Sequence, residues 1–160
     1  MTKAVDHEQF MQHAINLSVE KMLAGQGGPF GAVIVKDGKV IAEGWNQVST
    51  QHDPTAHAEV VAIRAACQAL GNFELKGCVL YSSCEPCPMC LGAAYWARVD
   101  SLFYAATKAD AAAIGFDDHF IYQEIDKLPK DRKLTTQQLK RDDALVAFQR
   151  WQSKEDKITY

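Results

Sequence analysis

Residues 78–105 read CVLYSSCEPCPMCLGAAYWARVDSLFYA, and their pattern indicates the fold class. Its short apolar opening at 78–82 has the length and composition of a buried strand. Pro88 predicts the start of a helix that runs to Ala97, because proline is tolerated in the first turn of a helix. A further apolar run over 101–105 is typical of another strand. The stretch therefore predicts a strand, a helix and a strand in succession.

The residues before this stretch predict a helix and a β-hairpin. Asp6 is placed to cap the helix, which should end at the glycines within 25–28. Two β-rich runs follow at 31–36 and 39–44, and the dipeptide Asp37-Gly38 between them is a favoured two-residue turn. The pattern therefore indicates two antiparallel strands that are adjacent in the chain.

The remaining segments are mainly helical in pattern. Asp53 is placed to cap a second helix, expected over 54–70 with proline at its first position. Beyond Lys108 the pattern predicts a short helix, a loop around 115–118 and a last helix from about 136 to 151. These helices and the strands above alternate along the chain.

This alternation favours a three-layer α/β/α sandwich, with a mixed central sheet of about five strands covered on both faces. No internal repeat or domain linker divides the chain, so we expect one domain over residues 1–160. A domain of this length can bury a core without help from a metal or a disulfide. A metal site would therefore serve function.

The charge pattern argues against a nucleic-acid-binding protein. The formal net charge is −3, and the 13 acidic side chains up to Tyr122 outnumber the 8 basic ones. The longest stretch without a charged side chain, 22–35, has 14 residues and includes four glycines, so it cannot span a bilayer. The first residues are acidic where a signal peptide would be basic and then apolar, which predicts a cytoplasmic protein.

Three of the five cysteines, Cys84, Cys87 and Cys90, recur at every third residue, which suits a metal site better than disulfides. With His57, Cys87 and Cys90 supply three ligands for a catalytic zinc ion and leave its fourth position to water. The residues alone leave two alternatives open. One is a closed structural zinc site that adds Cys84, and the other is an iron–sulfur cluster.

Glu59 distinguishes these alternatives, because neither a closed zinc site nor a cluster gives it a role. It lies two residues after His57, about 200° around a helix, so the two side chains are not expected to bind one metal from the same face. A carboxylate beside a zinc-bound water can instead act as general acid and base. The competing interpretation is a non-catalytic zinc-binding module.

The pairing of His57-Ala58-Glu59 with Pro86-Cys87-Pro88-Met89-Cys90 resembles the signature of zinc deaminases. Over nearly its whole length the chain is similar to the short bacterial guanine deaminases of the cytidine-deaminase-like superfamily. The segments that carry this resemblance are GGPFGAV at 27–33, EGWN at 43–46, DPTAHAEVVAIR at 53–64, SCEPCPMCLGA at 83–93 and IGFDDHFIY at 114–122. The zinc segments are also found in cytosine and tRNA adenosine deaminases, so the substrate depends on the others.

The resemblance implies a set of substrate-binding residues. A Phe in the position of Phe30 packs against the purine in this family, and an Asn in the position of Asn46 hydrogen-bonds it. An Asp in the position of Asp117 and a Tyr in the position of Tyr160 reach the substrate, although the neighbouring Asp118 competes with Asp117 for that role. Ala58, between the ligand His57 and Glu59, is also expected to line the site.

The resemblance further implies one zinc ion per chain and hydrolytic deamination of guanine to xanthine and ammonia. It implies a homodimer in which the segment from about 123 to 160 crosses to the partner subunit and closes its active site. Cytosine or guanosine are the alternative substrates. A tRNA substrate is less favoured, because acidic side chains outnumber basic ones up to Tyr122 and such a surface attracts an RNA backbone only weakly.

Overall fold

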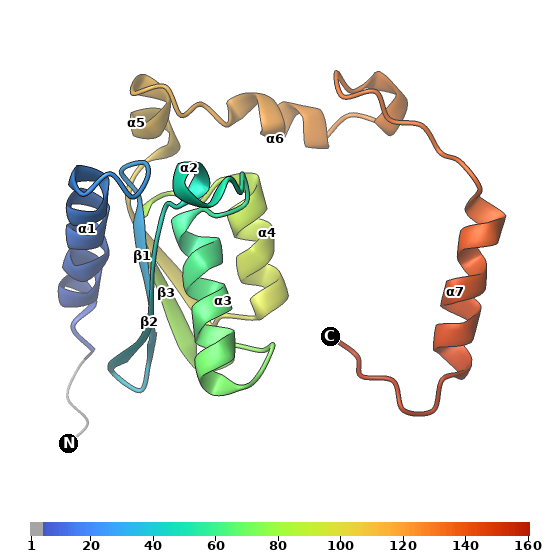
Figure 1. Ribbon diagram of the computed structural model, residues 1–160, viewed down its shortest axis with the longest axis horizontal. Helices are drawn as coiled ribbons and strands as arrows, with labels where there is room; N and C mark the ends of the chain where they lie inside the picture. Colours follow the sequence, from blue (N-terminus) through green and yellow to red (C-terminus); the bar gives the residue numbers. More distant parts are fainter. Residues whose placement is uncertain (1–4) are drawn as a thin grey trace. The chain divides into compact units, whose positions relative to one another are not determined.

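The computed structural model describes residues 5–160, which form two compact units at 5–118 and 119–160. The first unit contains a four-stranded mixed sheet with the strand order β2-β1-β3-β4 (Figure 1). The helices and strands of this unit are α1 (His7–Leu23), β1 (Gly31–Lys36), β2 (Lys39–Trp45), α2 (Val48–Gln51), α3 (Ala58–Leu70), β3 (Cys78–Cys84), α4 (Pro88–Ala97), β4 (Ser101–Ala106) and α5 (Lys108–Ala113).

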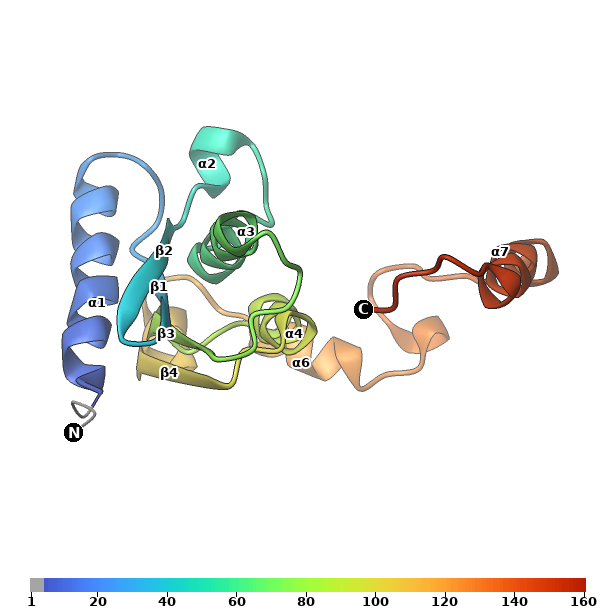
Figure 2. The same cartoon turned by 90° about the horizontal axis from the view of Figure 1, so that it is seen from below.

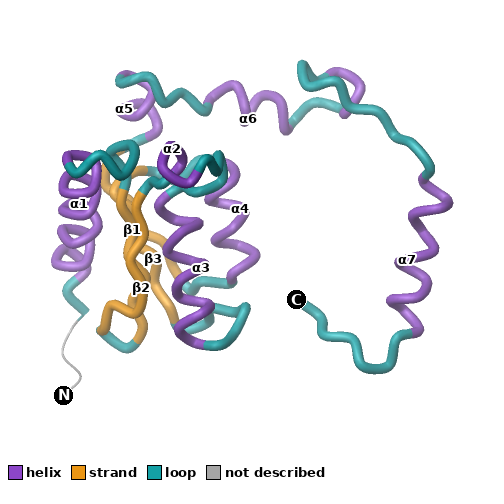
Figure 3. Tube along the Cα trace, in the orientation of Figure 1, coloured by secondary structure: helices purple, strands orange, loops and turns teal. Residues whose placement is uncertain are grey.

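The first unit has three layers, as the sequence predicts. Helix α1 covers one face of the sheet, and α3 and α4 cover the other (Figure 2). Residues of β1 alternate between the two cores: Val33 and Val35 face α1, whereas Ala32 and Ile34 face α3 and α4. The sheet has four strands where about five are expected from the sequence, because the described chain after β4 turns into helices (Figure 3).

Local sequence signals account for the hairpin and for the first helix. Asp37 and Gly38 both have positive φ, 50° and 73°, as the favoured tight hairpin turn requires, and β1 and β2 pair antiparallel on either side. The Asp6 side chain accepts a hydrogen bond from the Gln9 backbone N–H at 3.0 Å and caps α1. Both predictions are confirmed.

The strand, helix and strand predicted for 78–105 are confirmed as β3, α4 and β4. Strands β3 and β4 are parallel neighbours, and α4 makes the crossover between them. The carboxyl end of β3 therefore runs directly into α4 at residues 85–87.

Two helix boundaries predicted from the sequence are wrong. Helix α3 begins at Ala58 and not at residue 54, because the Asp53 carboxylate accepts hydrogen bonds from the Thr55 N–H and hydroxyl and closes a turn there. The last helix begins at Arg141 and not near 136, since Lys140 adopts a left-handed conformation that no helix continues through.

The second unit contains α6 (His119–Ile125), a 3-10 helix at Pro129–Asp131 and α7 (Arg141–Ser153). None of its described side chains is buried. Its exposed large apolar side chains are Phe120, Ile125, Leu128, Leu134, Leu139, Val146, Phe148, Trp151, Ile158 and Tyr160. So much apolar surface on one short segment is typical of a protein interface.

No helix within residues 5–160 combines the length and apolar character needed to cross a bilayer.

Candidate metal centre and active site

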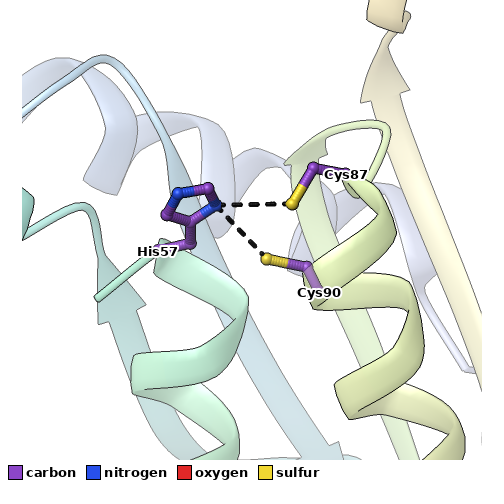
Figure 4. Close-up of side chains that lie close together, drawn as sticks. All are labelled: His57, Cys87 and Cys90. Carbon is purple, nitrogen blue, oxygen red and sulfur yellow. Dashed lines mark hydrogen bonds between the residues drawn. The ribbon is translucent and has the colours of Figure 1, made fainter. Parts of the chain in front are cut away.

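The three predicted zinc ligands lie together at the N-terminal ends of α3 and α4 (Figure 4). The Nδ1 atom of His57 is 3.5 Å from the Cys87 Sγ atom and 3.5 Å from the Cys90 Sγ atom. Tetrahedral zinc with ordinary Zn–N and Zn–S bonds sets such atoms roughly 3.5 Å apart. Two thiolates and one imidazole are also the ligand types that zinc prefers, so these residues fit the ion.

Cys84, which the alternative of a closed structural zinc site would require as a fourth ligand, is not part of this cluster. Its Sγ atom lies 3.7 Å from the backbone oxygen of Thr107, and its side chain is buried. Burial raises the pKa of the Cys84 thiol to about 11, so it stays protonated. Among the described residues, the only group of three side chains that could hold a metal ion is His57, Cys87 and Cys90.

Backbone conformation directs the ligands toward each other. His57 and Cys87 are the N-cap residues of α3 and α4, and both have extended backbones with no side-chain capping bond. Their side chains are therefore available to a metal. Cys90 follows in the first turn of α4, on the same side as Cys87. The partial positive charge at a helix N-terminus favours the thiolate form that zinc binding needs.

The loop before His57 is held by a small polar cluster. The Asp53 carboxylate accepts from the Thr55 N–H at 2.8 Å and from its hydroxyl at 2.6 Å, and Arg64 donates to the same carboxylate at 3.5 Å. These hydrogen bonds lower the pKa of Asp53, with the Thr55 hydroxyl as the largest cause. Because Arg64 belongs to α3, the cluster ties the loop to the helix that follows it.

The thiols share their protons unequally. A hydrogen bond from Cys90 lowers the pKa of the Cys87 thiol to about 4, and His57 adds to this effect. The same hydrogen bond raises the pKa of Cys90, as does burial. The hydrogen bond with Cys87 also raises the pKa of His57. The cluster thus offers one thiolate before metal binding, and zinc must displace the remaining protons.

Glu59 lies beside this cluster in the first turn of α3 and is only 6% exposed. Burial raises the pKa of its carboxyl group, and a hydrogen bond from Ser82 opposes the shift. The carboxyl group also interacts with the Cys90 thiol, which places it next to the metal ligands. A carboxyl group that is shielded from solvent and adjacent to the metal ligands can accept and release a proton beside the metal site.

Phe30, Asn46 and Ala58 occupy neighbouring positions in the first unit. The Asn46 backbone N–H donates to the Phe30 backbone oxygen at 3.1 Å, and Ala58 is fully buried at the start of α3. The Asn46 side-chain oxygen accepts from two backbone N–H groups, those of Gly28 and Val48, at 3.3 and 3.2 Å. With its oxygen held in this way, the Asn46 amide presents its NH2 group as a donor.

Two adjacent acidic residues, Asp117 and Asp118, follow α5. Burial raises the pKa of the Asp118 carboxyl group, and the charge of Cys87 adds to this shift. Asp117, the residue expected from the resemblance, precedes Asp118. Tyr160 belongs to the second unit, where its side chain is exposed.

Two contacts in this region involve residues that sequence reasoning missed. The Phe116 ring meets the Phe30 ring edge to face, with centroids 5.0 Å apart, and the Ser82 hydroxyl bonds Glu59. The two adjacent serines of β3, Ser82 and Ser83, follow an apolar run, and this pair was the available signal in the sequence.

Comparisons with known proteins agree with this chemistry. Residues 4–106 match the family described as the cytidine and deoxycytidylate deaminase zinc-binding region. The chain is 56% identical to the guanine deaminase of Bacillus subtilis over 156 residues, which is 98% of this chain and all of that protein. It is 40% identical to the tRNA-specific adenosine deaminase of Haemophilus influenzae over 71% of this chain and 65% of that one.

Solved structures of guanine deaminases are also similar to this chain. The X-ray structure of the Bacillus subtilis guanine deaminase has a TM-score of 0.95 and covers 97% of this chain and 99% of its own. A guanine deaminase from Nitrosomonas europaea has a TM-score of 0.68 at 36% identity, over 72% of this chain and 66% of its own.

Proposed function

We propose that this chain, which belongs to the bacterial guanine deaminases within the cytidine and deoxycytidylate deaminase family, hydrolyses guanine to xanthine and ammonia with the help of one zinc ion. The observation that carries this function is the buried Glu59 carboxyl group beside the two thiols and the imidazole of the metal cluster. A closed structural zinc site has no use for such a group. Identity over almost the whole chain to a guanine deaminase supports guanine as the substrate.

His57, Cys87 and Cys90 would hold the zinc ion. When bound there, zinc lowers the pKa of a coordinated water to about 7 and so supplies a nucleophile at neutral pH. The two cysteines reduce the positive charge of the site, which the two helix N-termini would otherwise increase.

Glu59 moves the protons of the reaction. It accepts a proton from the attacking water and passes it to the ring nitrogen next to the carbon that carries the amino group. It then transfers the second proton of that water to the departing amine. The bond from carbon to the amino nitrogen breaks, a carbonyl forms, and ammonia leaves. A raised pKa suits this work, because the carboxyl group must be a base first and an acid afterwards.

Phe30, Asn46 and Ala58 bind the purine. Phe30 offers an aromatic ring for packing, and the small side chain of Ala58 leaves room beside the metal ligands. The Asn46 NH2 group can donate to the acceptor edge of guanine, because the bonds to Gly28 and Val48 set its orientation.

The remaining substrate contacts come from the acidic pair after α5 and from Tyr160. The Asp117 carboxylate accepts from the amino group and ring N–H of guanine, and the neighbouring Asp118 is the alternative for this contact. Tyr160 provides a second contact to the substrate.

We also propose a homodimer in which the segment from about 123 to 160 of each chain closes the active site of its partner. The unburied apolar side chains of the second unit support this assembly. Helix α4 supports it too, since it has no charged residue and exposes Met89, Leu91, Tyr95 and Trp96. Five free cysteines fit a reducing compartment, so the proposed location is the cytoplasm.

The experiment that tests the function offers the purified, zinc-loaded protein five substrates in parallel and measures ammonia. The substrates are guanine, guanosine, adenine, cytosine and a tRNA anticodon stem. Release from guanine alone supports the proposal. Release from guanosine or cytosine keeps the zinc chemistry and overturns the substrate, whereas release from the tRNA stem makes the chain an RNA-modifying enzyme.

A further inference from the structure

We propose that Ser82 is a positioning residue for the deamination, whose hydroxyl group holds one oxygen of Glu59 and thereby sets the direction of the carboxyl group. This inference rests on the proposed function. The Ser82 Oγ atom lies 2.9 Å from Glu59 Oε1, across the interface between β3 and α3. The two residues are 23 positions apart in the chain, so only the folded structure joins them.

Burial makes this hydrogen bond hard to replace. Ser82 is 2% exposed and Glu59 is 6% exposed, so solvent water has little access to either group. A glutamate side chain has three rotatable bonds and samples several rotamers when nothing holds its carboxyl group. A fixed Oε1 atom restricts those rotamers and keeps the carboxyl group beside Cys90. Loss of the hydroxyl would leave the Glu59 carboxyl group near the metal ligands but without a fixed orientation toward them.

The Ser82 hydroxyl has a second partner that suits it to this role. Its Oγ atom also lies 2.8 Å from the backbone oxygen of Cys84, which can only accept. One hydroxyl proton cannot serve both acceptors fully. The hydroxyl group therefore lies between the Cys84 carbonyl and the Glu59 carboxyl group, and both contacts fix its place on β3.

Ser83 supplies a matched control on the same strand. It is also buried, at 8% exposed, but its Oγ atom lies 3.0 Å from the Gly31 backbone nitrogen and accepts from that N–H. The S83A variant therefore removes a buried hydroxyl from the next residue of β3 without touching Glu59. A general loss of packing in β3 would affect both variants alike.

The experiment compares S82A, S82T, S82V and S83A with the wild-type protein, all loaded with zinc. It measures kcat and KM for guanine, zinc content, thermal stability, and the Kd for xanthine by calorimetry. Threonine and valine have nearly the same shape, and only threonine keeps a hydroxyl group. This pair separates the hydroxyl from the volume of the side chain, and xanthine binding reports on the site without turnover.

We expect S82A and S82V to lower kcat by about 10- to 100-fold, with KM, zinc content and xanthine affinity within about twofold of wild type. S82T should recover most of kcat, and S83A should keep it. The inference is overturned if S82A turns over guanine like wild type, if it changes KM alone, or if S83A loses as much kcat. A wild-type protein with no activity on guanine overturns the proposed function first and this inference with it.

Discussion

The roles proposed for Glu59 and Cys87 differ although both residues lie in one site, and two substitutions separate these roles. Glu59 is buried beside the metal ligands without being one of the three, whereas Cys87 provides the thiolate. Glu59→Ala should therefore keep zinc and lower kcat by about 10²- to 10⁴-fold, which is the usual contribution of a general acid and base. Cys87→Ala should lose the zinc as well.

Zinc content by atomic absorption and ammonia release, measured on the same samples, check both expectations. The role assigned to Glu59 fails if the zinc-replete Glu59→Ala protein remains active.

Asn46 allows a sharper test of substrate binding than truncation does. Asn46→Asp keeps the oxygen that accepts from Gly28 and Val48 and replaces only the NH2 group. We expect an unchanged melting temperature but a KM for guanine raised by about 10-fold or more, because a donor to the purine is lost and an unpaired charge takes its place. Steady-state kinetics and thermal denaturation measure the two effects. An unaltered KM would remove Asn46 from the substrate site.

At the scale of elements, the contact between β2 and α3 decides where the ligand helix sits. Gly44 in β2 has no room for a side chain, since a Cβ atom there would lie 2.1 Å from the backbone oxygen of Ala58. Within the chain, a Cβ atom on Gly92 in α4 would meet nothing within 4 Å. The two glycines therefore predict opposite effects for the same substitution to alanine.

Gly44→Ala should destabilise the fold by about 1–3 kcal/mol and weaken zinc binding, because it pushes on the start of α3 next to His57. Gly92→Ala should stabilise the fold by about 0.5–1 kcal/mol, since alanine is the better helix former. Urea denaturation of the zinc-loaded proteins measures both changes. Equal effects from the two variants would contradict this account of the packing.

At the scale of the whole molecule, the proposed exchange of C-terminal segments makes a prediction about mixed dimers. If Tyr160 acts on the partner's site, a dimer of one Glu59→Ala chain and one Tyr160→Ala chain contains one intact site. We expect each variant to be inactive when expressed alone. Random assembly makes half of the dimers mixed, so co-expression should restore about a quarter of wild-type activity. The same mixture should sediment as a dimer.

If Tyr160 acts within its own chain, the mixed dimer has no intact site and the mixture stays inactive. Co-expression of Glu59→Ala with Glu59→Gln is the matched control, because neither arrangement of that pair provides an intact site.

The sequence determined the features that depend on neighbours along the chain. Turn chemistry at Asp37-Gly38 specified the hairpin, and Pro88 marked the start of α4. The three metal ligands were also identified from the sequence, because thiol and imidazole chemistry needs only the residue types and their spacing. Features of this kind are set by bonds that span a few residues.

Only the tertiary structure decided the features that join distant residues. The need for glycine at position 44 arises because β2 packs on the start of α3, where a Cβ atom would lie 2.1 Å from the backbone oxygen of Ala58. The contact of Ser82 with Glu59 arises because β3 packs against α3, and the sequence pattern of neither element predicts this hydrogen bond. Hydrogen bonds between elements depend on how those elements pack, and packing is a property of the whole fold that local sequence patterns do not contain.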